Sequence, residues 1–120
     1  ATWDRLNALA ANVAVLDAAG MVLAVNDAWR SFADENGMCS PSYGVGMNYL
    51  GICEQADGEG AREARLVAEG IRDVISGRYA SVYCRYGYET EDRRHLFAVR
   101  VSRVRESMTP RIVVSHERIF

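Results

Sequence analysis

The stretch that decides the fold is VLDAAGMVLAVNDAW, residues 15–29. Two apolar runs in it are separated by a short segment that begins with Asp17 and ends with Gly20. Aspartate at the first position and glycine at the fourth suit a type I turn that closes through a left-handed residue. The stretch therefore predicts a β-hairpin whose strands are residues 13–16 and 21–25.

Asn26 directly follows the second strand of this hairpin. Its side chain can begin a helix by accepting a hydrogen bond from the backbone N–H of Ala28 or Trp29. Trp29 and Phe32 recur at helical spacing, so we expect both to pack inward on a helix that ends near Asp34.

The rest of the chain contains three more helical patterns and three more strand patterns. The helices are expected at residues 2–10, 48–56 and 61–76, and the strands at residues 79–89, 94–104 and 112–119, with Pro110 in the loop before the last strand. Five strands with the main helices inserted after the second make an α+β domain. We expect one antiparallel sheet with helices over one face, which is a natural setting for an interior pocket.

Composition limits the class of protein. The chain has 120 residues, 49% of them hydrophobic and 25% charged, which is typical of one globular domain. Its net charge of -2 argues against a nucleic-acid partner, because phosphate binders carry a basic face. No apolar run approaches the ~20 residues that cross a bilayer, which argues against membrane insertion. Cys39, Cys53 and Cys84 are odd in number and lack metal-ligand spacing, so we expect a reducing, cytoplasmic location and no metal.

Three segments of the chain resemble one family. Residues 15–29 resemble the opening of a PAS domain, in which an aspartate-to-glycine hairpin precedes an asparagine that begins the first lid helix. GVGMNYL at residues 44–50 is similar to a subgroup found in bacterial sensor kinases, and VVSHERIF at residues 113–120 resembles the last PAS strand. In the family that strand often finishes with Asp-Ile-Thr, whereas this chain keeps only Ile119. The resemblance covers about residues 12–119.

The resemblance implies a PAS-like five-stranded antiparallel sheet, with a flanking helix at residues 1–11 and a sensory domain at residues 12–120. It also implies a segment of a larger bacterial signal-transduction protein, such as a sensor histidine kinase of a two-component system. Such a segment has a covalently attached output domain and no catalytic activity of its own. We expect it to detect a small ligand in an internal cleft, to mediate homodimerisation and signal relay, or to do both. One alternative is a purely structural dimerisation module without a ligand. Another is a small, cone-shaped α+β isomerase-like enzyme, which would place most helices before most strands.

Two sets of residues are candidates for these functions. The first set would line the ligand cleft and consists of Tyr49, Cys53, Ile71, Tyr86, Phe97, Val99, Val101, Val113 and Ser115. The second set lies on one side of the N-terminal helix and would form the dimer interface, and it consists of Trp3, Leu6, Leu9 and Ala10. Cys53 and Cys84 lie on apolar faces and are expected to be buried packing residues. Cys39 lies in a loop, and its redox role is open.

The sequence does not identify a cofactor, and it argues against two familiar ones. Haem-binding PAS domains generally ligate iron from the long helix, which here spans residues 61–76 and contains no histidine. His95 is expected in solvent, and His116 is expected at the surface or an interface. Flavin-binding light sensors of this fold carry a reactive cysteine directly after an asparagine of the second lid helix, where this chain has Asn48 followed by tyrosine. Ser115 and His116 are neighbours on one strand, so their side chains point to opposite faces and make no catalytic pair.

Overall fold

The computed structural model describes residues 11–35, 44–56, 61–89, 94–106 and 109–118, and the side chains within residues 32–35, 61, 86–89, 94–97, 105–106, 109 and 118 lie outside this description. Its elements follow the order β1 (Asn12–Leu16), β2 (Val22–Val25), α2 (Asp27–Glu35), α3 (Tyr49–Glu54), α4 (Ala61–Ile75), β3 (Ser81–Glu89), β4 (Arg94–Glu106) and β5 (Thr109–Arg118).

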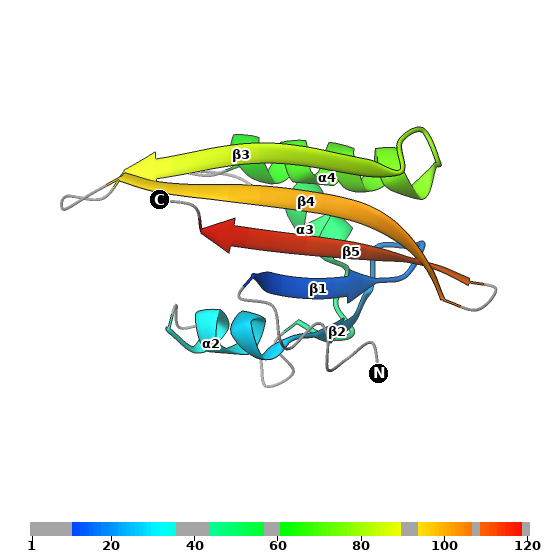
Figure 1. The fold of residues 1–120 in the computed structure, drawn as a ribbon, viewed down its shortest axis with the longest axis horizontal. Coiled ribbons are helices and arrows are strands. Elements are labelled where there is room, and N and C mark those ends of the chain that lie inside the picture. The colour runs from blue at the N-terminus through cyan, green and yellow to red at the C-terminus, as the bar shows by residue number, and fades with distance from the viewer. Residues whose placement is uncertain (1–10, 36–43, 57–60, 90–93, 107–108, 119–120) are drawn as a thin grey trace.

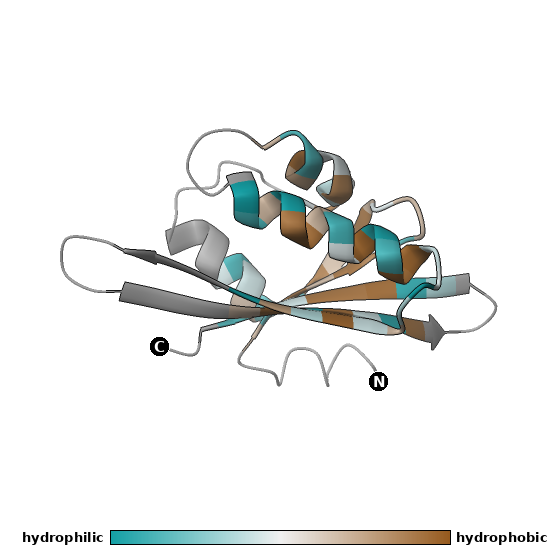
Figure 2. Ribbon diagram, turned by 90° about the horizontal axis from the view of Figure 1, so that it is seen from above, coloured by the Kyte–Doolittle hydropathy of each residue, from teal (hydrophilic) through white to brown (hydrophobic). Residues whose placement is uncertain are grey.

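The five strands form one antiparallel sheet in the order β2-β1-β5-β4-β3 (Figure 1). Helices α2, α3 and α4 lie on one face of this sheet, which we call the inner face (Figure 2). The expected α+β architecture with a five-stranded antiparallel sheet is therefore confirmed. Within the described residues, β1 and β2 precede α2, α3 and α4, and the other three strands follow them.

The turn between β1 and β2 has the predicted chemistry. Gly20 adopts a left-handed φ of 87°, and its N–H donates to the carbonyl of Asp17 at 3.0 Å. The Asp17 carboxylate accepts hydrogen bonds from the backbone N–H groups of Ala19 and Met21. A side chain that satisfies the backbone two and four residues ahead stabilises such a turn locally. The hairpin is therefore determined by residues adjacent in the chain.

Helix α4 lies over strands β3 and β4 and supplies most of the helical part of the core. Its four buried side chains recur at helical spacing and are Val67, Ala68, Ile71 and Val74. They pack in one hydrophobic cluster with residues of β1, β2, β4 and β5. Val82 and Cys84 of β3 pack against this cluster but are only partly buried. The most enclosed strand residues include Val99, Val101, Ile112 and Val114, all at most 1% exposed. The middle of the inner face is thus packed core.

The largest difference from the expected boundaries lies at the start of the last strand. Pro110 was expected in a loop, but it is the second residue of β5 and lies opposite Arg105 of β4. Proline cannot donate a ladder hydrogen bond, so sheets tolerate it near the start of a strand. The β4–β5 hairpin accordingly extends to Glu106 and Thr109, beyond the apolar alternation on which the expectation rested.

Candidate functional site between the helices and the last strand

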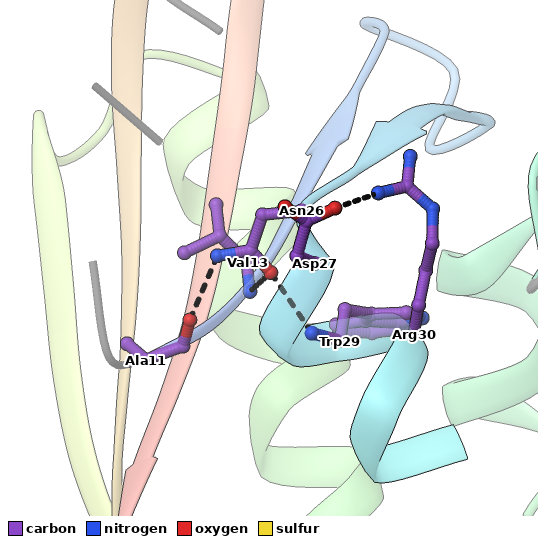
Figure 3. A network of polar contacts seen from close by, with 6 residues as sticks. All are labelled: Ala11, Val13, Asn26, Asp27, Trp29 and Arg30. Atoms are coloured by element: carbon purple, nitrogen blue, oxygen red, sulfur yellow. Dashed lines mark hydrogen bonds and ion pairs between the residues drawn. The ribbon is translucent and has the colours of Figure 1, made fainter. Parts of the chain in front are cut away.

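Asn26 joins the first hairpin to helix α2. The residue is fully buried, with 0% of its surface exposed. Its Oδ1 accepts hydrogen bonds from the N–H groups of Val13 and Trp29, each at 3.0 Å, and its Nδ2 donates to the carbonyl of Ala11 at 2.8 Å (Figure 3). The predicted helix cap on Trp29 is confirmed, and the same amide also holds the start of β1. Asn26 therefore sets where α2 leaves the sheet and where the Trp29 indole lies.

Helix α3 is positioned by the turn on the other side of the hairpin. The Asn48 side chain caps α3 by accepting from the N–H of Gly51 at 2.9 Å. The carbonyl of Gly20 accepts from the N–H of Tyr49 at 3.0 Å, so the hairpin turn holds the first residue of the helix. A Cβ at position 20 would lie 2.5 Å from Cβ of Leu50, which only a glycine avoids. This close seating directs Tyr49 toward the inner face of the sheet.

Tyr49, His116 and Trp29 meet over the inner face, and we call them, with Cys53, the α3–β5 cluster. The Tyr49 hydroxyl lies 3.0 Å from Nε2 of His116, within hydrogen-bond distance, and this contact joins residues that are 67 positions apart. The Trp29 ring meets both partners edge-on, with ring centroids 5.9 Å from Tyr49 and 6.0 Å from His116. Such edge-to-face contacts are favourable arrangements of aromatic rings. Elements α2, α3 and β5 are thereby tied together at one point.

His116 is held as a neutral imidazole. Burial lowers its pKa from 6.5 to about 4, because removal from water disfavours the charged form. His116 is partly buried and lies opposite Val99 on β4, on the face that α2 and α3 cover, so it is not the solvent-facing residue that a surface position would imply. The neutral ring can accept a hydrogen bond at one nitrogen and donate from the other.

Cys53 lies one helical turn after Tyr49 and extends the cluster into the core. It is 5% exposed, which confirms the expected burial. Burial raises the pKa of its thiol, and a side-chain hydrogen bond with Tyr49 opposes part of that rise. Burial also raises the pKa of the half-buried Cys84. Both groups are free thiols, and neither has the lowered pKa that a reactive cysteine needs.

Charged groups lie around the cluster and pair with one another. Arg72 of α4 contacts Glu54 of α3 at 2.6 Å, and Arg30 contacts Asp27 within α2, also at 2.6 Å. These pairs are substantially exposed, so each contributes little to stability. The cluster offers an imidazole, a hydroxyl, a thiol and an indole edge, which can orient a small uncharged molecule through hydrogen bonds and ring contacts.

The structure divides the predicted cleft residues into four groups. Tyr49 and Cys53 belong to the α3–β5 cluster. Ile71, Val99 and Val101 pack against one another in the core, at 0–1% exposure. Val113 and Ser115 lie opposite Ser102 and Arg100, on the outer face of the sheet, so their proposed place in the cleft is wrong. The side chains of Tyr86 and Phe97 fall outside the described part, although their backbones pair in register.

The structure does not describe the residues of the predicted dimer interface, so this prediction and those for Cys39 and His95 stay predictions. Trp3, Leu6, Leu9 and Ala10 all precede the first described residue, and the Cys39 and His95 side chains are also outside it.

Sequence reasoning missed the roles of Trp29 and His116 in the cluster. A signal for His116 was present, because it alternates with Ile112 and Val114, both of which are buried. Residues two apart on a strand share a face, so the alternation puts His116 on the same face as Ile112 and Val114, and the structure shows that this face is the buried one. For Trp29 the inward direction was expected, but no local pattern indicated its partners.

Within the described segments, no three His, Cys, Asp or Glu side chains gather closely enough to hold a metal ion. Over the same segments, no helix combines the length and the apolar character that a membrane span requires.

Comparison with protein sequences gives one informative relative. No family model matches the chain. An uncharacterized 104.1 kDa protein in the hypE 3' region of Rhodobacter capsulatus is 44% identical over 77 residues, which are 61% of this chain and 8% of that protein. The chain thus matches a small part of a much longer relative.

Solved structures identify the fold. The PAS domain of BvgS from Bordetella pertussis has a TM-score of 0.68 at 14% identity, over 99% of this chain and 84% of that chain. The PAS domain of an HTR-like protein from Haloarcula marismortui has a TM-score of 0.57 at 20% identity, over 98% and 94%. The photoactive yellow protein domain of the sensor histidine kinase Ppr from Rhodospirillum centenum has a TM-score of 0.60 at 11% identity, over 96% and 91%. The chain therefore has the PAS fold.

Proposed function

We propose that this chain is the sensory domain of a larger cytoplasmic signalling protein and that it detects a small uncharged ligand at the α3–β5 cluster. In this proposal residues 12–120 form the sensory unit, and a covalently attached output domain, such as a histidine kinase, receives its signal. The domain itself carries no catalytic step. The single observation that carries the proposal is the hydrogen bond between Tyr49 and His116, which joins a covering helix to a central strand.

The solved relatives support a sensory role at the level of the fold. BvgS contributes a PAS domain, and Ppr is a sensor histidine kinase whose photoactive yellow protein domain has the same architecture. Proteins with a common fold differ in function because their sites differ, so the side chains of the cluster determine which ligand can bind. Its neutral imidazole and protonated thiol favour an uncharged ligand, because the arginines around it, Arg30 and Arg72, already pair with Asp27 and Glu54.

Signal relay follows from where the hydrogen bond lies. A ligand with its own donor or acceptor can replace the Tyr49–His116 contact and let α3 move relative to β5. Strand β5 pairs with both β1 and β4, so a change at His116 reaches the centre of the sheet. A ligand shifts such an equilibrium only by its difference in affinity for the two arrangements. Replacing one hydrogen bond in only one arrangement provides that difference.

One observation favours the alternative of a ligand-free packing and dimerisation module. Ile71, Val99 and Val101 fill the centre of the inner face at 0–1% exposure. In this alternative the α3–β5 cluster only packs α2 and α3 against β5, and the helix expected at residues 2–10 pairs two chains through Trp3 and Leu6.

Native mass spectrometry distinguishes the two functions. The freshly purified chain is compared with its denatured mass and its visible absorption spectrum, beside a Tyr49→Phe variant. Direct sensing predicts a non-covalent added mass that disappears on denaturation and falls at least threefold in occupancy in Tyr49→Phe. Sequence mass alone, unchanged after incubation with cell extract, contradicts ligand sensing and supports the packing module. A bound molecule unaffected by Tyr49→Phe places the ligand away from the cluster.

A further inference from the structure

The two edge strands of the sheet differ in whether another segment of the chain hydrogen-bonds to their outer side. Strand β2 has four residues, and residues 46–48 lie along its outer side. The N–H of Val22 donates to the carbonyl of Met47 at 2.9 Å, and the N–H of Gly46 donates to the carbonyl of Val22 at 2.9 Å. These bonds satisfy the outward N–H and C=O of Val22, at the start of the β2 edge.

Strand β3 forms the opposite edge and has no such cover among the described residues (Figure 1). It has nine residues, and its register with β4 runs without interruption from Ser81 opposite Ser102 to Glu89 opposite Arg94. Proteins usually protect an edge with proline, lysine, a bulge or a very short strand. Strand β3 contains no proline or lysine and has no bulge. A long, regular edge of this kind is suited to pairing with another strand.

The backbone groups that face this edge follow from the ladder. The N–H of Arg103 donates to the carbonyl of Ala80 at 3.0 Å, so the pair at positions 80 and 103 is a hydrogen-bonded one. Bonded and non-bonded pairs alternate along an antiparallel ladder. The N–H and C=O groups of Ser81, Tyr83 and Arg85 therefore point away from β4 and toward the open edge.

Side-chain burial also indicates an incomplete edge. Val82 and Cys84 lie opposite Val101 and Val99 on the inner face. The two β4 residues are at most 1% exposed, whereas Val82 and Cys84 are only partly buried. A further strand beside β3 would cover the exposed part of both side chains.

We propose that β3 pairs antiparallel with β3 of a second copy of this chain, with Cys84 opposite Cys84 of the partner subunit. A two-fold axis perpendicular to the sheet pairs residues that share a face, so the central residue faces its own counterpart. Centring on Arg85 would oppose two like charges, which is destabilising. Centring on Cys84 instead places Arg85 opposite Tyr83 of the partner subunit.

The complementarity of that register is visible within one chain. Tyr83 is 49% exposed on the outer face, and the guanidinium groups of Arg85 and Arg100 lie 6.0 and 5.7 Å from its ring centroid. An arginine over a tyrosine ring is attractive. In the dimer the pairing of Arg85 with the partner's Tyr83 repeats this contact across the edge. The result is one continuous ten-stranded sheet.

Oxidative cross-linking of the native chain tests the pairing. Copper(II)-phenanthroline removes two electrons and two protons from two facing thiols and leaves a disulfide. Trypsin cleaves after arginine, so Cys84 falls in residues 79–85, whereas Cys39 and Cys53 fall together in residues 31–62. The proposal predicts a disulfide-linked pair of the 79–85 peptide as the main product, and predicts its loss when oxidation is carried out in denaturant. A predominance of cross-links through residues 31–62, or no cross-link, overturns it.

A matched pair of variants tests whether backbone pairing is responsible. Tyr83→Pro removes an N–H that points to the open edge and leaves the β3–β4 bonds intact, because an edge strand tolerates proline there. Tyr83→Thr keeps that N–H and suits a strand. With circular dichroism confirming that both fold, the proline variant should weaken dimerisation at least tenfold in sedimentation equilibrium, and the threonine variant less than threefold. Equal effects overturn the proposal.

The pairing is independent of the proposed ligand site. A double variant, Trp3→Glu with Leu6→Glu, should leave the 79–85 cross-link in place, which separates this interface from one made by the N-terminal helix. A cross-link that disappears in this double variant assigns the dimer to the helix and overturns strand pairing. The mass-spectrometry result on ligand binding does not enter either outcome.

Discussion

Replacing Asn26 with alanine should cost far more stability than loss of a helix cap. The change leaves three backbone groups without their side-chain partner, namely the N–H groups of Val13 and Trp29 and the carbonyl of Ala11. A lost cap alone costs about 1 kcal/mol. A buried backbone group left unsatisfied costs about 1–3 kcal/mol. Adding the groups of Ala11 and Val13 to the cap gives about 3–7 kcal/mol, a large part of the roughly 5–15 kcal/mol that stabilises a typical domain.

The chain supplies a matched control in Asn48. It also caps a helix, but it is exposed, and its side chain accepts from the N–H of Gly51. Asn48→Ala should therefore cost about 1 kcal/mol. Urea denaturation followed by tryptophan fluorescence measures both variants against the native chain, with equal slopes as the check that unfolding stays two-state. If the two variants differ by less than about 1 kcal/mol, the tie from Asn26 to β1 contributes nothing and the reasoning fails.

Three other predictions concern single sites. Burial lowers the pKa of His116 from 6.5 to about 4, so its contribution to the free energy of unfolding is complete above pH 6.5 and falls by about 2 kcal/mol at pH 5. His116→Gln should reduce this loss of stability between pH 8 and pH 5, measured by urea denaturation at both pH values. An unchanged loss in the variant would show that the imidazole is already solvated. Gly20→Ala should lower the free energy of unfolding by at least about 2 kcal/mol more than Gly46→Ala in the same denaturation. Both glycines have a left-handed φ, but only position 20 lacks room for a Cβ. Equal destabilisation would contradict the tight contact between the β1–β2 turn and α3. Cys53 should react with N-ethylmaleimide more slowly than Cys84 in peptide mapping, because it is buried and Cys84 is half-buried; the reverse order would mean that α3 opens readily.

Local chemistry accounts for what could be predicted from the sequence. The Asp17–Gly20 turn and the Asn26 cap each depend on hydrogen bonds between residues at most four positions apart. Such bonds form wherever the right side chain meets the right backbone conformation. The amphipathic pattern of residues 61–76 likewise indicated which side of α4 would be buried. These features, with the order of strands and helices, were enough to predict the α+β architecture.

Other features depend on residues that are distant in the chain. Alternation along β5 separates Val113 and Ser115 from Val114 and His116, but only pairing with β1 and β4 under the helices decides which set faces the core. The 3.0 Å contact of His116 with Tyr49 exists because α3 rests on the β1–β2 turn. The lowered pKa of His116 comes from its burial, which the sequence around it does not contain. The sequence by itself determined the elements and their order, because local bonds and periodicity specify them. Only the tertiary structure decided the α3–β5 cluster and the open edge of β3, because both arise from long-range packing.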